Sequence, residues 1–377
     1  MLITISSAFD SGNVELLGWV GPAHARLAIR ADAGGEFRQW FHFRVSGARG
    51  LALTLDITGL RQSAYPLGWP GYRARVSTDR QRWVQAQTDY DPDAENGRLR
   101  IEVTPATDHL WVAYFAPYSM ERHQDLVARI GARPGVSARI LGDSIEGRPI
   151  DCLEMGAGDR PIWIYARQHP GETMAEWFME GALEALTDPA DPVARRLRQV
   201  ARLYLVPNMN PDGSFRGYLR TNAAGANLNR EWADPTAARS PEVLAVRDAM
   251  DRTGVDVALD VHGDEALPHV FIAGFEGVPG VTGSQMARLE SYKAHLVRHS
   301  RDFQTKVGYP MTPPGKANLG MSTNQLAHRF GCLAMTLEMP FKDSADHPEP
   351  VEGWSPARSG HLARACLAAL ADSLDDA

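Results

Sequence analysis

Two histidines and a glutamate in this chain have the residue types and the spacing of a metal site. His169 and Glu172 belong to a His-Pro-Gly-Glu segment that follows the apolar run RPIWIYAR and precedes a segment with helical spacing of apolar residues. Residues i and i+3 of one helical turn point the same way, so both side chains can reach one ion. His-x-x-Glu recurs by chance, however, and a surface histidine beside a glutamate at a helix N-terminus gives the same pattern. The pair indicates a metal only together with a third ligand.

The third candidate ligand is His262, which ends the apolar run DVALDVH. A glycine and an aspartate follow it, and this suits the rim of a site better than a packed interior. Two histidines and one glutamate, with the fourth position left to water, form the ligand set of catalytic zinc. Either Asp260 or Asp264 could orient the imidazole of His262 by accepting a hydrogen bond from it. The sequence therefore predicts one zinc ion per chain, held by His169, Glu172 and His262.

Glu338 is the candidate general base. It lies near the end of the run CLAMTLEMP, which is too apolar to favour a charge. A carboxylate is rarely buried unless something stabilises it, and partial desolvation raises its pKa toward the range of a useful base. A glutamate that faces solvent from an edge strand is the alternative. We favour the base, because this run reads as the last buried strand and ends in a carboxylate.

A polar segment between these runs offers donors for a carboxylate or an oxyanion. It begins with Asn-Pro-Asp-Gly, a turn signature, and continues with Arg220, Asn229 and Arg230. Two arginines and an asparagine in a glycine-containing loop suit recognition of a carboxylate and of a developing oxyanion. Loop arginines are usually solvated, so this segment indicates a site only beside the zinc ligands.

Buried strands and helices must position these residues. From about residue 130 the chain alternates compact apolar runs with helical segments, two of which begin at Ser240-Pro241 and Ser355-Pro356. This alternation predicts an α/β domain with a mostly parallel or mixed central sheet. Earlier in the chain, short runs rich in aromatic and β-branched residues are separated by turns; LALTLDI at 51–57 is one of them. These runs predict an antiparallel β-sandwich.

We place the domain boundary so that the all-β sandwich covers residues 1–125 and the α/β catalytic domain covers residues 126–377. The chain has 377 residues, 44% of them hydrophobic, a formal net charge of −7 and a sequence pI near 6.0. The acidic balance argues against nucleic acid and anionic membranes as partners, since both favour clustered Lys and Arg. A homo-oligomer stays open.

Three cysteines, Cys152, Cys332 and Cys366, form neither a disulfide framework nor a CxxC metal pair. The N-terminus lacks the basic start and apolar run of a signal peptide. No run approaches the roughly 20 apolar residues of a membrane span. We therefore expect a reduced, cytoplasmic, soluble protein.

With these residues assembled, the chain resembles the zinc metallocarboxypeptidase family, and within it the cytosolic carboxypeptidase branch. The matching segments run in family order across residues 140–345 and are SIEGRPI, RQHPGETM, NPDG, RTNAAGANLNREW, LDVHGD and TLEMPFKD. HPGE and TLEMPFKD are similar to the cytosolic branch in particular, whose members carry a preceding β-sandwich domain. The resemblance implies a zinc carboxypeptidase domain with a mixed central sheet and a peptidase that hydrolyses the C-terminal peptide bond of a peptide or protein.

The resemblance also implies roles for individual residues. The three predicted ligands would hold zinc, and Glu338 would be the general base. Arg220 would stabilise the oxyanion, and Asn229 and Arg230 would bind the terminal carboxylate of the substrate.

Two further roles follow from the resemblance. A tyrosine closes over the substrate in the family, and Tyr309 is the candidate here. Branch members remove acidic residues such as glutamate, and Lys316 is the candidate cation of that pocket.

Two other functions stay open. A zinc amidohydrolase could act on N-acyl amino acids or on cell-wall peptides, although NPDG followed by the Leu-Asn-Arg segment favours a peptidase. A non-catalytic binding protein with a vestigial zinc site is the second alternative. The filled metal, oxyanion, clamp and base positions argue against it.

Overall fold

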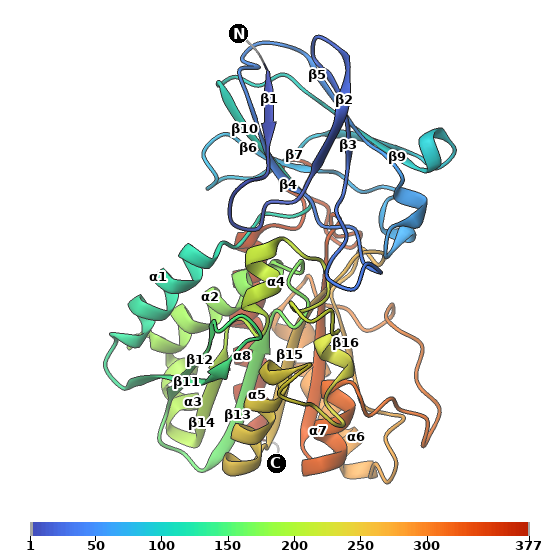
Figure 1. Cartoon of the computed structure of the whole chain (residues 1–377). Coiled ribbons are helices and arrows are strands. Elements are labelled where there is room, and N and C mark those ends of the chain that lie inside the picture. Colours follow the sequence, from blue (N-terminus) through green and yellow to red (C-terminus); the bar gives the residue numbers. More distant parts are fainter. Residues whose placement is uncertain (1–2, 376–377) are drawn as a thin grey trace.

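The N-terminal part of the chain is a β-sandwich that sits on a larger α/β part (Figure 1). The structure is a computed structural model that describes residues 3–375. In Figure 1 the blue and cyan strands of the sandwich lie at the top, and the α/β part and the C-terminus lie below. The two predicted fold classes are confirmed.

The sandwich consists of two five-stranded sheets, with the orders β1-β4-β10-β6-β7 and β2-β3-β5-β9-β8. Every neighbouring pair is antiparallel except β3 and β5, which run parallel. The strand predicted at 51–57 begins at Leu53, and Leu51 is exposed. The strands are β1 (Thr4–Ser6), β2 (Glu15–Gly21), β3 (His24–Ala28), β4 (His42–Ser46), β5 (Leu53–Ile57), β6 (Arg75–Ser77), β7 (Val84–Gln85), β8 (Gln87–Asp91), β9 (Arg98–Val103) and β10 (His109–Ala113).

The α/β part is built on a seven-stranded mixed sheet with the order β11-β12-β14-β13-β15-β17-β16. The four central strands β14, β13, β15 and β17 are parallel to one another, whereas β11, β12 and β16 pair antiparallel at the two ends. The strands are β11 (Val136–Asp143), β12 (Pro149–Met155), β13 (Arg160–Ala166), β14 (Ala201–Val206), β15 (Val257–Asp264), β16 (Phe271–Ala273) and β17 (Leu333–Pro340).

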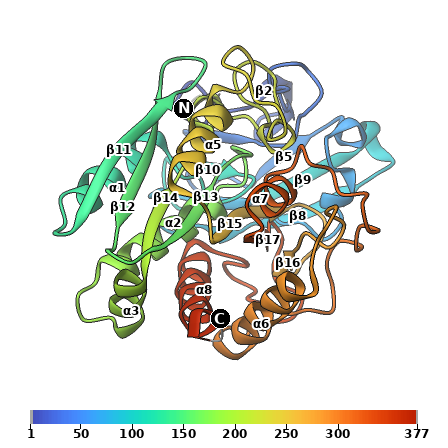
Figure 2. The same cartoon turned by 90° about the horizontal axis from the view of Figure 1, so that it is seen from below.

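Helices cover both faces of this sheet (Figure 2). Helices α1, α2, α3, α6 and α8 contact one another on one face, while α5 and α7 pack on the other. The helices are α1 (Met120–Gly131), α2 (Met174–Thr187), α3 (Pro192–Val200), α4 (Pro211–Arg216), α5 (Pro241–Thr253), α6 (Gly283–His299), α7 (Ser322–Phe330) and α8 (Pro356–Asp375). Helices α5 and α8 begin at the prolines that the sequence singled out, because proline is preorganised for the first helical position.

The Asn-Pro-Asp-Gly segment starts a helix, so its interpretation as a simple turn was wrong. Pro211 is the first residue of α4, and the side chain of Asn210 accepts a hydrogen bond from Gly213 N. Asparagine and proline favour helix starts as well as turns, and here the next turn of backbone continues as a helix.

The carboxyl ends of the parallel strands β13, β15 and β17 face the sandwich. His262 of β15 lies opposite Glu338 of β17 in the register of the sheet. Parallel strands end at one edge, and the loop with His169 follows β13 at that edge. The topology therefore brings residues from three distant segments to one place.

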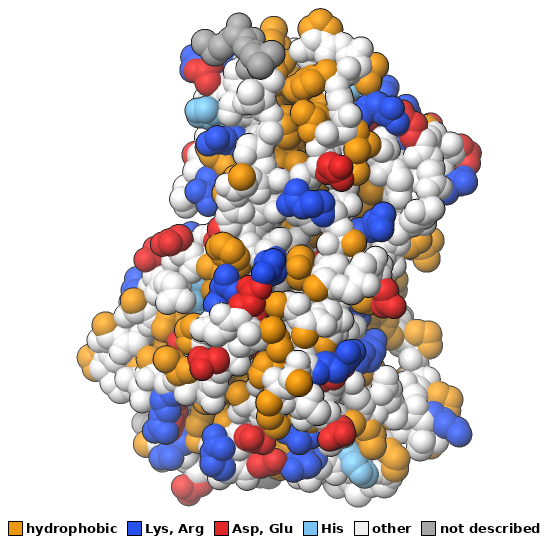
Figure 3. Space-filling view, in the orientation of Figure 1, with side chains coloured by type: hydrophobic (Ala, Val, Ile, Leu, Met, Phe, Trp, Pro, Cys, Tyr) orange, Lys and Arg blue, Asp and Glu red, His pale blue; other side chains and the backbone are white. Residues whose placement is uncertain are grey.

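Apolar side chains are exposed on β2, an edge strand of the sandwich. Leu16, Leu17, Trp19 and Val20 are all at least 38% exposed, and apolar groups gather over this upper part of the molecule (Figure 3). Within residues 3–375, no helix has both the length and the apolar character to cross a membrane.

Candidate active site

The three predicted metal ligands lie together and are buried. Ligand atoms of His169, Glu172 and His262 are all within 4.8 Å of one another. The carboxylate of Glu172 contacts both rings, with Oε1 2.7 Å from Nδ1 of His169 and Oε2 2.7 Å from Nδ1 of His262. The two Nδ1 atoms are 3.1 Å apart.

The outer ring nitrogens show why this arrangement suits a cation. Nε2 of His169 is 3.0 Å from Oδ1 of Asn227, and Nε2 of His262 is 2.9 Å from Oδ1 of Asp260. A ring nitrogen that faces an acceptor carries the proton, which leaves the lone pair on the other nitrogen. Both Nδ1 atoms and the carboxylate then face one another as acceptors, so a zinc ion fits between them. Of the two aspartates considered for His262, only Asp260 lies against its imidazole, as an ion pair.

Arg167 holds the loop that carries the first two ligands. Its guanidinium is buried and donates to the carbonyl oxygen of Pro170 and, at 2.5 Å, to Oε2 of Glu176. Its backbone has a φ of 59°, which is uncommon outside glycine. The strand therefore ends in a sharply turned residue whose side chain binds the backbone three residues further on, in the loop that carries His169 and Glu172.

Glu338 lies beside the ligand cluster and is 6% exposed. Strand β17 runs between β15 and β16, so the alternative of a glutamate that faces solvent from an edge strand is wrong. Burial, with the charges of Glu172 and Asp264 nearby, raises the pKa of the Glu338 carboxyl well above its usual range, against the lowering effect of His262. Its Oε2 atom has no hydrogen-bond partner among the described residues.

Tyr309 reaches the same place from the segment between α6 and α7. Its hydroxyl donates to Oδ2 of Asp264 at 2.6 Å and is 3.2 Å from Oε1 of Glu338. Asp264 thus holds the tyrosine rather than the imidazole of His262.

A cavity of about 440 Å³ opens onto these groups. Arg220, Asn229 and Arg230 line it together with the zinc ligands, Glu338 and Tyr309. The side-chain oxygen of Asn229 accepts a hydrogen bond from Ser322 N at 2.9 Å, which leaves its amide nitrogen as a donor. The cavity therefore holds three donor side chains together with the buried carboxylate of Glu338.

Lys316 does not line this cavity. Its side chain is exposed, and its backbone nitrogen closes a turn by donating to Pro313 O at 3.0 Å. The structure thus brings together eight of the nine predicted site residues and leaves this lysine on the outer surface.

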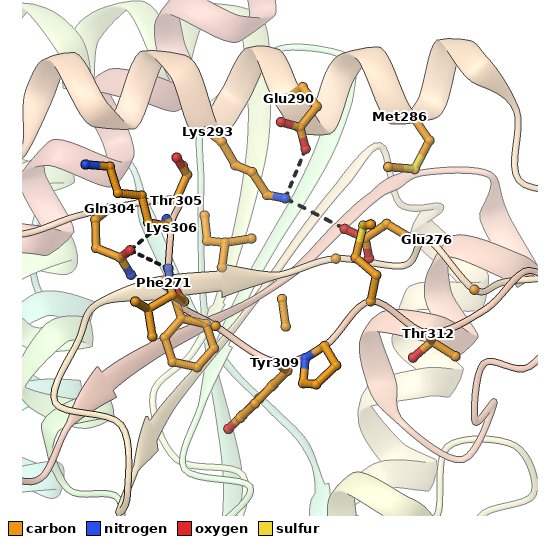
Figure 4. A pocket seen from close by; sticks show the side chains of 18 of the residues that line it. Phe271, Glu276, Met286, Glu290, Lys293, Gln304, Thr305, Lys306, Tyr309 and Thr312 are labelled. Carbon is orange, nitrogen blue, oxygen red and sulfur yellow. Dashed lines mark hydrogen bonds and ion pairs between the residues drawn. The ribbon is translucent and has the colours of Figure 1, made fainter.

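A second cavity, of about 420 Å³, is drawn in Figure 4. It adjoins the first, because Ala273, Tyr309 and Met321 line both. Helix α6 forms one wall, from which Lys293 donates to Glu290 at 3.0 Å and lies 3.7 Å from Glu276. The ring of Tyr309 points away from this helix. The tyrosine therefore stands between the two cavities.

Sequence reasoning missed two groups that line the first cavity. Glu265 follows the ligand strand directly and is buried, and burial raises the pKa of its carboxyl well above its usual range. The position of Glu265, directly after the segment His262-Gly263-Asp264, could have indicated that it belongs to the site. Tyr65 comes from the sandwich, and nothing in its local sequence indicates a site.

Comparison with known proteins agrees with this geometry. A family model described as "Cytosolic carboxypeptidase N-terminal domain" matches residues 5–115, and one described as "Zinc carboxypeptidase" matches residues 126–345. Among curated relatives, cytosolic carboxypeptidase 6 of Caenorhabditis elegans is 24% identical, over 90% of this chain and 79% of the relative.

Solved structures are similar over the whole chain. A metallo-carboxypeptidase from Burkholderia cenocepacia is 44% identical with a TM-score of 0.96, and the match covers 100% of both chains. A metallo-carboxypeptidase from Pseudomonas aeruginosa, in complex with (2-guanidinoethylmercapto)succinic acid, is 46% identical with a TM-score of 0.95 and covers 99% of both chains.

Proposed function

Because this chain belongs to the zinc carboxypeptidase family and is a peptide-bond hydrolase, we propose that it removes the C-terminal residue of peptides and prefers glutamate or aspartate there. One observation carries the peptidase chemistry. The buried carboxylate of Glu338 lies in register with the ligand His262 on the next strand and opens onto a cavity with two arginines. A base, a metal site and anion-binding donors thus surround one space.

In this proposal Glu338 moves the protons. When bound, the zinc ion supplies Lewis-acid polarisation of the scissile carbonyl and of the attacking water. The Oε2 atom of Glu338, which has no hydrogen-bond partner among the described residues, takes the proton from that water. The same carboxyl then gives the proton to the departing amine.

The cavity donors bind and orient the substrate. Arg220 donates to the oxygen of the scissile carbonyl as negative charge develops on it. Arg230 and the amide nitrogen of Asn229 hold the terminal carboxylate, since both line the cavity beside Arg220. Tyr309 covers the bound residue from the side of the second cavity.

The acidic preference rests on the resemblance to the cytosolic branch and on the charge of Lys316. Within residues 3–375 this ammonium has no acidic partner, whereas Lys293 is paired with Glu290 and Glu276. An unpaired ammonium can bind a substrate carboxylate without first losing an ion pair. The proposal requires the segment with Lys316 to approach the cavity when a peptide binds.

The ligand of the Pseudomonas aeruginosa relative bears on the same question. Its succinic acid carries two carboxylates, which suits a site that binds a carboxyl terminus, and its guanidino group resembles a basic side chain. A preference for C-terminal Lys or Arg is therefore the competing outcome.

The test is a peptide series that differs only in the last residue, incubated with the zinc-loaded chain while the released amino acid is measured. We expect the highest kcat/KM for Glu and Asp, reduced by added salt because the ion pair is partly screened. Lys316→Ala should lower kcat/KM for Glu-terminated peptides at least tenfold and leave Leu-terminated ones unchanged, and Lys293→Ala is the matched control. If kcat/KM falls equally for Glu-terminated and Leu-terminated peptides, Lys316 does not bind the acidic side chain of the substrate. Faster release of Lys, Arg or Phe by the parent would reject the acidic preference.

The same measurement separates the other zinc hydrolases. N-acyl amino acids and cell-wall peptides, added as substrates, should be cleaved far more slowly than C-terminal peptide bonds. We also propose a cytoplasmic location, supported by three cysteines that are buried and unpaired.

A further inference from the structure

A carboxylate of the β-sandwich binds the backbone at Arg220. Asp32, in the connection between β3 and β4, is 4% exposed. Its Oδ1 accepts from Leu219 N at 2.8 Å, and its Oδ2 accepts from Arg220 N at 2.6 Å and from Thr221 N at 3.1 Å. Three successive N–H groups thus converge on one side chain from a residue 188 positions earlier in the chain.

Further contacts attach the same stretch of backbone to the sandwich. Thr221 Oγ1 donates to Ala33 O at 3.2 Å, and Asn13 Nδ2 donates to Gly217 O at 2.9 Å. We call residues 215–221 the arginine segment. Its hydrogen bonds to the sandwich run along its whole length, so the position of this segment depends on the sandwich.

The guanidinium of Arg220 is also placed by the sandwich. Its central carbon lies 5.2 Å from the ring centre of Tyr65 and 5.8 Å from that of Phe37, both favourable cation–π distances. In the described part of the chain, no side chain or carbonyl accepts a hydrogen bond from this guanidinium. Two rings and the backbone therefore determine where its donors point, and those donors stay available to a substrate.

We propose that Asp32 is a positioning residue for Arg220, through which the β-sandwich completes the active site. The inference rests on the proposed role of Arg220 at the scissile carbonyl. Without the three hydrogen bonds the backbone at residues 219–221 can shift, and a displacement of about 1 Å at a reacting geometry can cost up to about 10²-fold in rate. The sandwich then acts on turnover as well as on stability.

The test is a double-mutant cycle on the full zinc-loaded chain, with Asp32→Asn, Arg220→Ala and the combined variant. Burial raises the pKa of Asp32 to about 6, against the hydrogen bonds from Arg220, Leu219 and Thr221, so assays at pH 8 compare an ionised carboxylate with a neutral amide. Asp32→Asn should lower kcat at least tenfold in the parent and less than twofold in the Arg220→Ala background. Zinc content and Tm are measured on each variant.

Controls separate positioning from a general loosening of the structure. Gln85→Ala removes hydrogen bonds from the sandwich to Glu349 and Pro350, away from the arginine segment, and should leave kcat unchanged. Phe37→Leu removes one ring beside the guanidinium and should lower kcat in the parent but not in Arg220→Ala. If Asp32→Asn does not fold, Phe37→Leu still tests whether the sandwich positions Arg220, and a parent-like kcat in Phe37→Leu would then reject the inference.

Each failure has its own signature. If the losses in kcat of the two single variants multiply in the combined variant, or if Asp32→Asn keeps a parent-like kcat, this inference is rejected while the proposed role of Arg220 stands. A parent-like kcat in Arg220→Ala would reject the proposed role of Arg220 and this inference with it.

Discussion

The proton positions on His169 and His262 decide what this site can hold. Each ring presents its outer nitrogen to an oxygen acceptor, so each inner nitrogen keeps a lone pair. Glu172 adds a carboxylate between them, and three acceptors without a donor favour a cation. Glu338, one strand away, is no part of this set, which suits its proposed role in proton transfer.

Glu338→Gln should therefore separate chemistry from metal binding. The amide keeps the shape of the side chain but cannot take a proton, so we expect turnover to fall by about 10²–10⁴ with one zinc per chain retained. His262→Ala is the matched variant, which should lose the zinc as well as the activity. Elemental analysis and turnover of both proteins give the answer. Near-normal turnover in Glu338→Gln, or stoichiometric zinc in His262→Ala, would contradict these assignments.

Helices α1 and α2 hold the ligand loop through a buried charged group. His123 of α1 lies with Nδ1 2.6 Å from Glu176 of α2 and with Nε2 3.2 Å from Asp151 of β12. Glu176 also pairs with Arg167, whose guanidinium binds the loop of the zinc ligands. Burial lowers the pKa of His123, but the charge of Glu176 and hydrogen bonds to Asp151 and Glu176 raise it to about 9.

This pairing predicts a loss of stability in mild alkali. The folded pKa of His123 is above the unfolded value of about 6.5, so the charged ring stabilises the fold fully below that value and loses its contribution as the pH rises through about 9. The difference corresponds to about 3 kcal/mol of unfolding free energy. His123→Gln should lack this component and give a flatter profile between pH 6.5 and 9 in urea unfolding. Parallel profiles for the two proteins would contradict the prediction.

The sandwich covers the edge of the sheet where the site lies. Besides the arginine segment, it contacts the loop after β15, where Gly68 packs on Glu265, and the segment after β17, where Lys342 Nζ donates to Leu67 O at 3.1 Å. Each of these contacts adjoins a strand or loop that carries a site residue. The two parts of the molecule therefore share the cavity.

Gly217→Ala should show how closely the parts fit. Gly217 has a φ of 69°, and an added Cβ would lie 2.6 Å from Ser11 O of the sandwich. Gly280 has a φ of 77° with nothing within 4 Å of such a Cβ, so Gly280→Ala has only the backbone cost of about 1–2 kcal/mol. We expect Gly217→Ala to lower the unfolding free energy by about 1–3 kcal/mol more than this control. If urea unfolding gives both variants the same loss of unfolding free energy, the interface accommodates the added Cβ of Gly217→Ala without a measurable cost.

Local sequence determined the elements and the chemistry that belong to one segment. The apolar runs before His169 and around His262 and Glu338 predict the strands that place them, because side-chain periodicity reflects burial along one element. The three candidate zinc ligands and the candidate base could be identified from the sequence for the same reason. The start of α4 at Pro211 was not, since turns and helix starts use the same residues.

Tertiary structure alone decided which distant groups join the site. Asp32, Phe37 and Tyr65 carry no local signal, because each acts through a contact with the backbone or the guanidinium of Arg220, more than 150 residues away in the chain. Lys316 is the converse case, because the family resemblance made it a candidate for the pocket while the fold leaves it exposed and outside the cavity. The amino-acid sequence by itself was enough to predict the two fold classes and to single out the candidate metal ligands and the candidate base, since those follow from patterns within single elements. The shape of the cavity and the role of the sandwich depend on how those elements pack, and packing is a property of the whole chain.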